Sequence, residues 1–378
     1  MKLCVFPNDS ILSYYQKGEI KERYFNPLNL FDEVHVISLF DDEVDEKLVQ
    51  KLAGKGVLKI HKLKKANLSN YKIFRQEVIS LVSSLNPLLI RAFNSRVPGW
   101  LATNTALKLG IPLVISLHTN YDQQRDLAKR ERNFFRYFKL LYSKKLEKYC
   151  LKNADAVICV YEFIVPYAKK MKSKNIQVIY NKVDTKKFSN NVRKKFFATK
   201  PTIISVGRLI EQKNHRYLIE AMKNLDAKLL IIGDGPNLES LNKIIQTLNL
   251  ENKVEIIKKV SNDELPNYYV SCDLYVQPME NLGGIPIPVL EAMACGLPVV
   301  MSKHSNNDSE IIDDAVVFVE NNSDSFFNAF NKILSNPEYK EKLKRKSLNV
   351  ITKISGEKME EEELSLYRKL IDKTKKIT

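Results

Sequence analysis

The sequence predicts an α/β protein of two doubly wound domains, each a parallel sheet with helices on both faces. Short apolar runs alternate with segments of helical period along the whole chain, which is typical of buried parallel strands joined by helical crossovers. The alternation restarts after a polar, basic stretch near the middle. With 378 residues, the chain is long enough to bury two cores.

The first half contains seven candidate strands, at 3–6, 34–38, 57–60, 88–92, 113–117, 156–160 and 177–180. The second half contains five, at 202–206, 229–232, 254–257, 274–277 and 298–301. Helices are expected between them, at 74–85, 99–109, 214–225, 238–248 and 289–295. In sheets of this kind, ligands bind beyond the carboxyl ends of the strands.

The same pattern predicts the domain boundaries. Residues 1–183 form the first domain, 184–200 a polar and basic linker, and 201–355 the second domain. The remaining segment, 356–378, contains an expected helix at 357–373. Its Leu364, Tyr367 and Ile371 recur at helical spacing, so we expect them to share a buried face.

Composition limits the class of protein. A content of 44% apolar and 28% charged residues is typical of a globular chain. No apolar run approaches the ~20 residues of a membrane-spanning helix. The first residues fit a buried strand rather than a signal peptide, so we expect a cytoplasmic protein. The cysteines are scattered and no His/Cys/Asp cluster accompanies them, which predicts reduced thiols and no metal site.

The net charge of +16 favours an anionic partner, such as nucleic acid, an acidic lipid surface or a phosphorylated substrate. A Lys- and Asn-rich composition that merely raises the isoelectric point explains it equally well. The basic residues form no uninterrupted tract and no nucleic-acid-binding module is recognisable. We therefore expect no nucleic-acid partner.

One loop combines glycines with the start of a helix. Gly283 and Gly284 precede the expected helix, and Glu291 lies inside it. Glycine lets a backbone approach a ligand closely, and a helix start offers N–H groups to a phosphate. A carboxylate nearby suits sugar hydroxyls. This chemistry fits a nucleotide-sugar site, although an ordinary helix with a surface Glu fits the segment as well.

A second loop carries two cations where the strand 202–206 ends. Gly207 permits a tight turn, Arg208 offers a planar fork of donors, and Lys213 a mobile point charge. Two cations in one loop suit a diphosphate, whose charge grows as a sugar departs. Two solvated surface cations are the alternative, but the position at a strand end favours a functional role.

Four ordered motifs resemble the donor-binding domain of glycosyltransferase family 4, also called glycosyltransferase group 1. They are GRLIEQKN from Gly207, LLIIGDGP from Leu229, VSNDELPNYYVSCDLYVQP from Val260 and PVLEAMACGLPVV from Pro288. The resemblance implies two Rossmann-like domains facing a central cleft, the GT-B fold. It also implies that the final helix returns to the first domain.

The resemblance further implies residue roles. Arg208 and Lys213 match the diphosphate-binding pair, and Glu291 matches the Glu that holds the ribose hydroxyls. The remaining donor-binding positions are the phosphate-loop residues Gly284, Ile285 and Ile287, the motif glycines Gly207 and Gly233, and Lys258 in the turn that reads the base.

Gly283 marks a departure from the family pattern. It stands where the family usually has a Glu that contacts the transferred sugar, and Pro286 replaces a familiar glycine. Either Glu280 reaches in from a remodelled loop, or backbone groups including that of Gly283, together with Asn281, hold the sugar. The identity of the donor sugar stays open for this reason.

In the first domain, His118 follows the strand 113–117 and resembles the His that many family members place beside the reacting sugar. We interpret it, with Arg208 and Lys213, as catalytic; a loop His without a role is the alternative. The stretch Lys17 to Pro27 replaces the family's usual glycine pair. An acceptor or phosphate contact and a plain surface turn are equally good interpretations of it.

The segment 129–152 is basic with interleaved aromatic residues. A basic amphipathic helix of this kind can lie on an anionic membrane, which would make the protein peripheral at the inner membrane face. A core-facing aromatic stripe beneath a solvated basic face is the alternative, and we weigh it slightly higher.

The function implied is retaining, metal-independent hexosyl transfer without a cofactor. The donor is a nucleoside-diphosphate sugar, with UDP or GDP expected, and the acceptor a glycan, lipid-linked or other hydroxyl compound. Two alternatives stay open. The chain is a non-catalytic sugar-nucleotide-binding protein, as the missing Glu suggests, or a nucleotide-sugar epimerase of the same fold.

Overall fold

Parallel strand pairing organises both halves of the chain. The structure is a computed structural model, and it describes residues 1–16, 18, 20–40, 43–196, 199–279, 284–303 and 311–376. The chain divides into two compact units. Unit 1 comprises Met1–Asn181 and Glu357–Thr378, and unit 2 comprises Lys182–Gly356. The described part of the segment expected as a linker, 184–200, thus clusters with unit 2.

Unit 1 contains a seven-stranded sheet. Its strands are β1 (Lys2–Phe6), β2 (Glu33–Ser38), β3 (Val57–Lys62), β4 (Leu89–Ala92), β5 (Leu113–Leu117), β6 (Ala156–Cys159) and β7 (Ile176–Val178). Its α-helices are α1 (Ile11–Gln16), α2 (Glu46–Val49), α3 (Arg75–Leu85), α4 (Val97–Leu109), α5 (Tyr121–Arg130), α6 (Phe134–Asn153), α7 (Val165–Lys170) and α14 (Gly356–Lys375). Short 3-10 turns lie at Pro27–Asn29, Gln50–Ala53, Tyr71–Phe74 and Glu162–Ile164.

Unit 2 contains a six-stranded sheet. Its strands are β8 (Thr202–Val206), β9 (Lys228–Ile232), β10 (Val254–Ile257), β11 (Leu274–Gln277), β12 (Val299–Ser302) and β13 (Val316–Val319). Its helices are η5 (Glu211–Lys213), α8 (His215–Ala221), α9 (Leu238–Thr247), α10 (Leu265–Tyr269), α11 (Ile287–Ala294), α12 (Ser323–Leu334) and α13 (Pro337–Lys353).

The first six strands of unit 1 and the six strands of unit 2 have the same order, and unit 1 adds β7 at one edge. The strand orders are β3-β2-β1-β4-β5-β6-β7 and β10-β9-β8-β11-β12-β13, and the paired strands are parallel. In each unit the first strand lies inside the sheet, and the order reverses beside it, between β1 and β4 or between β8 and β11. Loops leaving these two neighbours diverge, which leaves room for a ligand at their carboxyl ends.

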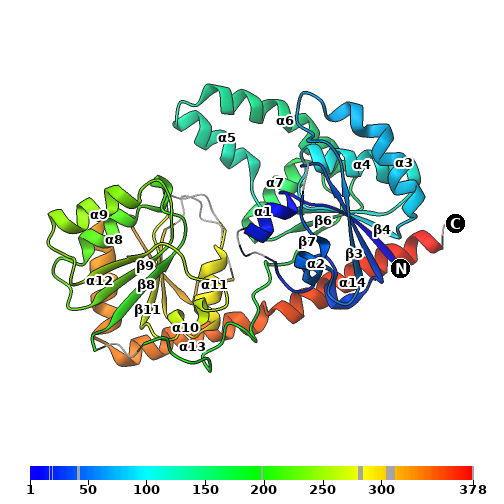
Figure 1. The fold of residues 1–378 in the computed structure, drawn as a ribbon. Coiled ribbons are helices and arrows are strands. Elements are labelled where there is room, and N and C mark those ends of the chain that lie inside the picture. Colours follow the sequence, from blue (N-terminus) through cyan, green and yellow to red (C-terminus); the bar gives the residue numbers. More distant parts are fainter. Residues whose placement is uncertain are drawn as a thin grey trace. The chain divides into compact units, whose positions relative to one another are not determined.

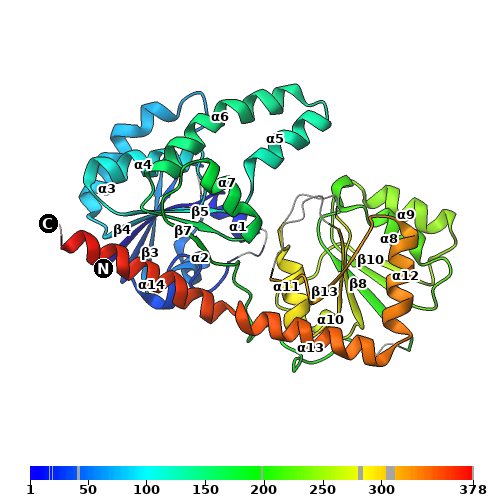
Figure 2. The same cartoon turned by 180° about the vertical axis from the view of Figure 1, so that it is seen from behind.

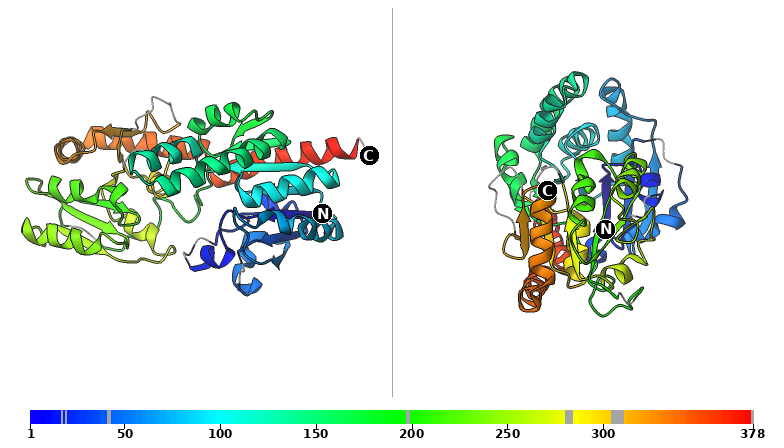
Figure 3. Two further views of the ribbon diagram at one scale, coloured as in Figure 1. Left: turned by 90° about the horizontal axis from the view of Figure 1, so that it is seen from above. Right: turned by 90° about the vertical axis from the view of Figure 1, so that its left-hand side faces the viewer.

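Helices cover both faces of each sheet (Figures 1, 2 and 3). In unit 1, α3, α4 and α6 lie on one face and α14 on the other. In unit 2, α8, α9 and α12 lie on one face, and α10, α11 and α13 on the other. The core of unit 2 lies between its sheet and these helices, with Phe326 and Phe330 fully buried against β-strand residues such as Leu229 and Ile231.

The predicted doubly wound α/β fold is confirmed in each unit, with strand boundaries displaced by at most two residues. The strands predicted at 113–117, 202–206, 254–257 and 274–277 have the observed bounds. The helix expected at 214–225 is shorter, because it ends at Ala221 and the chain continues as a turn; its Leu218, Met222 and Leu225 are nevertheless buried as predicted. No element was expected at β13, α12 or α13, nor at α1, α2, α5 or α7 of unit 1.

The buried face of α14 differs from the one expected. Tyr367 and Ile371 are buried as predicted, but two acidic residues, Glu360 and Glu363, are buried on the same helix. Glu360 lies 3.1 Å from Arg23 Nε and accepts the backbone N–H of Leu28. A face that the apolar pattern alone describes as hydrophobic is therefore partly ionic.

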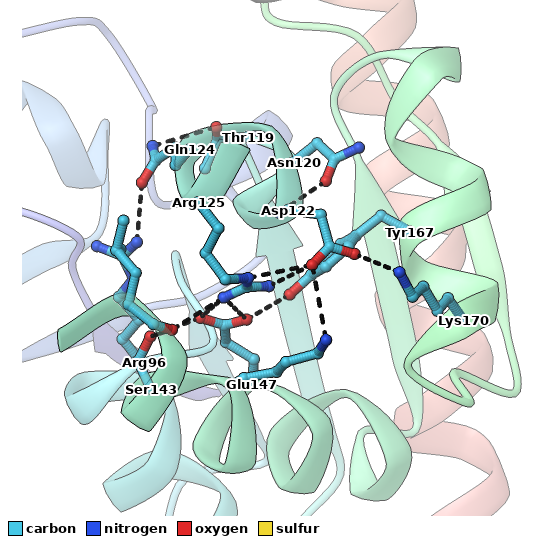
Figure 4. A network of polar contacts seen from close by, with 12 residues as sticks. Arg96, Thr119, Asn120, Asp122, Gln124, Arg125, Ser143, Glu147, Tyr167 and Lys170 are labelled. Carbon is cyan, nitrogen blue, oxygen red and sulfur yellow. Dashed lines mark hydrogen bonds and ion pairs between the residues drawn. The ribbon is translucent and has the colours of Figure 1, made fainter. Parts of the chain in front are cut away.

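The α5–α6 hairpin is fixed to unit 1 by a buried ionic network (Figure 4). Arg125 on α5 lies 2.9 Å from Glu147 Oε2 on α6 and 2.9 Å from Asp122 Oδ1. Ser143 and Tyr167 each donate a hydrogen bond to Glu147, at 2.7 and 2.6 Å. Since Arg125 and Glu147 are almost wholly buried, the pair joins α5, α6 and α7 at a site that water does not screen.

The aromatic residues at the start of α6 are exposed. The exposed fractions are 62% for Phe134, 84% for Phe135, 64% for Phe138 and 51% for Tyr142. Residues farther along the helix, including Leu146 and Cys150, are buried. The interpretation of 129–152 as a core-facing aromatic stripe is therefore wrong for these four residues, because α5 and α6 project beyond the sheet (Figures 1 and 2).

We expect Glu147→Ala to destabilise unit 1 by about 3–5 kcal/mol, because it leaves Arg125 buried without its main counter-ion. The control is Glu131→Ala, which breaks the exposed pair with Arg136 and should cost less than about 1 kcal/mol. Chemical denaturation followed by circular dichroism measures both. Equal effects of the two substitutions would contradict the assignment of the network as the anchor of the hairpin.

Candidate functional site

The predicted donor-site residues of unit 2 collect at the carboxyl edge of its sheet. Gly207 and Arg208 follow β8, Gly233 follows β9, and Lys258 follows β10. Backbone hydrogen bonds tie these loops together, since Gly207 N–H donates to Ile232 O at 3.0 Å and Gly233 N–H donates to Ile257 O at 2.9 Å. The structure thus brings together four residues that are separated by up to 51 positions in the sequence (258 minus 207).

Lys213 lies between the two loops that diverge at the reversal of strand order. It ends the short helix after β8, and its Nζ lies 3.5 Å from Met279 Sδ, which follows β11. Its hydrogen-bond partner is a sulfur, a weak acceptor, and no ion pair joins it to a carboxylate of the described chain. Burial lowers the pKa of Lys213 to about 8. A partly buried cation without a counter-ion favours an anionic ligand.

Two glycines let these loops approach one another. A Cβ at Gly233 would lie 1.9 Å from the carbonyl oxygen of Gly207, and one at Gly235 would lie 2.4 Å from that of Leu209. Any larger residue at Gly233 would push the β8 loop away from the β9 loop. The two glycines of the GDGP motif are therefore needed because the backbone of the β9 loop contacts the backbone of the β8 loop directly.

Glu291 is a buried carboxylate on α11. It is 6% exposed and accepts a hydrogen bond of 3.2 Å from the hydroxyl of Tyr269. Burial and the neighbouring Glu291 raise the pKa of Tyr269 well above its usual value, so this hydroxyl stays protonated and donates. The ring of Tyr269 packs 5.9 Å from that of Tyr275, on β11. The carboxylate is therefore held in place by the Tyr269 hydroxyl, and Tyr275 packs against the ring of Tyr269.

The start of α11 offers few backbone donors. The helix begins at Ile287, between Pro286 and Pro288, which have no N–H. Val289 N–H already donates to Pro286 O at 2.9 Å. Among the predicted phosphate-loop residues, Gly284 and Ile285 are buried and Ile287 is half-buried. Few backbone N–H groups are therefore left at the start of α11 for the phosphate binding that the sequence predicted.

The remaining predicted residues are exposed or lie outside the described parts of the chain. Arg208 and Lys258 are exposed at the carboxyl edge. Glu280, Asn281 and Gly283, on which the sugar contact depends, lie outside the described residues. The same holds for Lys17 and Glu19 of the N-terminal stretch.

His118 lies at the corresponding edge of unit 1, directly after β5. Its Nε2 is buried without a hydrogen-bond partner among the described residues, and its ring stacks on Phe93 at 6.1 Å between centroids. Burial and the nearby Arg91 guanidinium lower the pKa of His118 to about 4. A neutral imidazole at a strand end can donate or accept one hydrogen bond with a hydroxyl.

Sequence reasoning missed the residues that support these sites. His215, two positions after Lys213, is 2% exposed, and its Nε2 has no hydrogen-bond partner among the described residues; burial lowers its pKa to about 4. Tyr269 donates a hydrogen bond to Glu291, and Arg91 packs on Phe93, the ring that stacks on His118. The sequence offered one signal for these residues, which is the charged Arg91 inside the otherwise apolar strand LIRA. Nothing in the sequence around Tyr269 or Tyr275 indicated a supporting role.

Neither a metal cluster nor a membrane span was found in the described parts of the chain. No group of three His, Cys, Asp or Glu side chains there is arranged to hold a metal ion. No described helix combines the length and the apolar character that crossing a bilayer requires. The five cysteines are buried and unpaired with one another.

We expect binding of a diphosphate at Lys213 to take up a proton above pH 8. The free pKa is about 8, and an anion raises it, so affinity is constant below pH 8 and decreases as the pH rises above it. Calorimetry at pH 8.5 in buffers of different ionisation enthalpy measures the uptake. Lys213→Arg is the control, because its guanidinium stays charged; the same proton uptake in this variant would exclude Lys213 as the group that titrates.

Comparison with known proteins identifies the family. A model of glycosyl transferases group 1 matches residues 187–350, and one of glycosyltransferase family 4 matches residues 30–187. A UDP-Gal:alpha-D-GlcNAc-diphosphoundecaprenol alpha-1,3-galactosyltransferase of Escherichia coli is 26% identical over 350 residues, 85% of each chain. A GDP-mannose-dependent alpha-(1-6)-phosphatidylinositol monomannoside mannosyltransferase of Mycolicibacterium smegmatis is 30% identical over 125 residues, 30% of this chain and 33% of that protein.

Solved structures agree on the fold. The Anabaena protein HepE in complex with UDP has a TM-score of 0.74 at 14% identity, over 98% of this chain and 100% of that one. Since the two family models together span residues 30–350 and both describe glycosyltransferases, the chain belongs to the group 1, family 4 glycosyltransferases of the GT-B fold.

Proposed function

We propose that this glycosyltransferase moves a sugar from a nucleoside-diphosphate sugar to a lipid-linked hydroxyl acceptor, with retention of configuration and without a metal ion. The observation that carries the proposal is Lys213, a partly buried ammonium that pairs with no described carboxylate, at the point where the strand order of unit 2 reverses. A diphosphate supplies the charge that such a cation lacks. UDP and GDP are the expected nucleotides.

The relatives support this choice of substrates. The E. coli relative is named for a UDP-sugar donor and a diphosphoundecaprenol acceptor, and the M. smegmatis relative for a GDP-sugar donor and a phosphatidylinositol acceptor. Both acceptors combine a lipid with phosphate. The net charge of +16 fits substrates that are anionic at both ends of the reaction.

The proposed reaction needs no nucleophile from the protein. The bond between the anomeric carbon and the phosphate oxygen breaks, and the acceptor hydroxyl forms the new bond on the same face of the sugar. The proton of this hydroxyl passes to the departing phosphate oxygen. Lys213 and Arg208 stabilise the charge that grows on the diphosphate, and Glu291 holds the ribose.

His118 has a separate role in this proposal. Because its imidazole is neutral near pH 7, it orients a hydroxyl of the sugar or the acceptor through Nε2 without competing for the acceptor proton. Because orienting a reacting hydroxyl lowers the barrier of the chemical step, loss of His118 should lower kcat more than it weakens donor binding.

We expect one of UDP, GDP and ADP to bind saturably in calorimetric titrations, and Glu291→Ala to weaken that binding roughly ten- to hundredfold through loss of a charged hydrogen bond. Arg208→Ala should instead lower kcat roughly hundredfold, since its contact strengthens as the diphosphate leaves. The control is Arg345→Ala, an exposed Arg on α13.

The outcomes separate the alternatives. Transfer at the wild-type rate by Arg208→Ala would exclude the mechanism. Nucleotide binding without turnover toward any lipid-linked acceptor would favour a non-catalytic sugar-nucleotide-binding protein. Conversion of the donor sugar without an acceptor would indicate an epimerase. The anomeric configuration of the product, read by NMR, tests retention.

We also propose that the α5–α6 hairpin docks the enzyme on an anionic membrane, where a lipid-linked acceptor lies. The exposed aromatic residues Phe134, Phe138 and Tyr142 recur at i, i+4 and i+8, so they lie on one side of α6. Exposed cations surround them: Lys129, Arg130, Arg132, Lys139, Lys145 and Lys148. Aromatic insertion combined with a basic rim favours an anionic bilayer over a neutral one. The proposal implies a cytoplasmic enzyme that is peripheral at the inner membrane face.

We expect the triple substitution of Phe134, Phe135 and Phe138 by Ser to reduce binding to phosphatidylglycerol vesicles at least tenfold, because burial of three rings is lost. Co-sedimentation measures the bound fraction. Leu48→Ser is the matched control, because Leu48 is 52% exposed on α2 and should leave binding unchanged. Equal binding of all three proteins, or equal binding to neutral vesicles, would exclude the hairpin as the docking surface.

A further inference from the structure

A charged cluster is buried between the sheet of unit 1 and α14. Arg91 on β4 is 3% exposed and Glu363 on α14 is 4% exposed, and Arg91 Nη2 lies 3.2 Å from Glu363 Oε1. Tyr367 donates a hydrogen bond of 2.6 Å to the same carboxylate oxygen, and Ser116 on β5 contacts the guanidinium. Two helical turns of α14 thus meet one arginine of the sheet.

This cluster is poorly suited to stabilise the fold. The Nε and Nη1 of Arg91 are buried without an acceptor among the described residues. Each unmet donor costs free energy, and a buried ion pair is often no more stable than apolar residues of the same volume. Stability alone therefore does not explain why an arginine stands in a strand that is otherwise apolar.

The cluster is connected to His118 by stacked groups. The Arg91 guanidinium lies 5.0 Å from the centre of the Phe93 ring, and Phe93 stacks on His118 with an angle of 24° between the planes. Arg91 and Phe93 point to the same face because they alternate with Ala92, and β4 pairs with β5, which precedes His118. The row leads from the middle of the sheet to its carboxyl edge.

Charged groups face His118 from three elements. These are Arg91 on β4, Glu363 on α14 and Lys21 in the loop after α1. Burial, Arg91 and Lys21 lower the pKa of His118, because each disfavours a charged imidazole. Glu363 raises this pKa, because a carboxylate favours the charged form. The pKa of about 4 is the net result.

We propose that Arg91 and Glu363 are positioning residues for His118: the ion pair between Arg91 and Glu363 of α14 fixes the ring of Phe93, and Phe93 holds the imidazole in place with Nε2 at the carboxyl edge. This proposal rests on the proposed function only in assigning Nε2 to a substrate hydroxyl. The arrangement of the side chains is independent of any substrate. It also gives α14, which follows unit 2 in the chain, a direct part in the chemistry of unit 1.

The test is an NMR titration of the His118 ring, assigned by comparison with His118→Gln. In Arg91→Met we expect the pKa to rise from about 4 by about one unit or more, because a cation is lost and Glu363 remains. In Glu363→Gln it should fall further, because Arg91 is no longer balanced. Arg91→Lys should keep the low value. The acid limb of the kcat profile should move with the pKa.

The control is Glu360→Gln, which removes the other buried acid of α14, paired with Arg23 rather than Arg91. It should leave the His118 titration unchanged. If the pKa of His118 rose toward its ordinary value of 6.5 in both Arg91→Met and Glu363→Gln, the two substitutions would merely loosen the packing. If the pKa of His118 changed in neither variant, Arg91 and Glu363 would not be coupled to His118. Either result overturns the proposal. Since the titration needs no substrate, its result tests the positioning role of Arg91 and Glu363 whether or not the transferase assay succeeds.

Discussion

Parallel pairing of the strands is the constraint on which the sites of both units depend. Because neighbouring strands run in one direction, their carboxyl ends meet at one edge, and the loops that carry polar side chains gather there. In unit 2 the loops after β8 and β11 diverge at the reversal of order, and Lys213 and Met279 meet between them. In unit 1 the equivalent loops after β1 and β4 place Asn8 and Asn94 in contact at 3.2 Å.

The two units treat buried charge differently. Unit 1 pairs it, as in Arg125 with Glu147 and Arg91 with Glu363, whereas unit 2 keeps Lys213 partly buried without a described counter-ion. A paired charge fixes the elements that carry it, and an unpaired one favours a ligand of opposite sign. This difference suits a division of work in which unit 1 orients groups and unit 2 holds an anion.

Much of the proposed donor site could be chosen from the sequence, because its residues lie close together along the chain. Gly207, Arg208 and Lys213 lie within seven positions, and a strand end is readable from the apolar run before it. Residues that act through a partner far along the chain were not predictable in this way. Arg91 and Glu363 are 272 positions apart (363 minus 91), and the apolar period of α14 pointed to Leu364 instead of the acid next to it.

The alternation of strands and helices, the two doubly wound units and the family follow from the sequence, because hydrophobic periods and local motifs lie within short segments. Tertiary packing sets which polar side chains are buried, which are paired and which aromatic residues face water. Exposure of Phe135 and burial of Glu363 depend on what packs against each helix. That information arises when distant segments meet, so no window of sequence contains it.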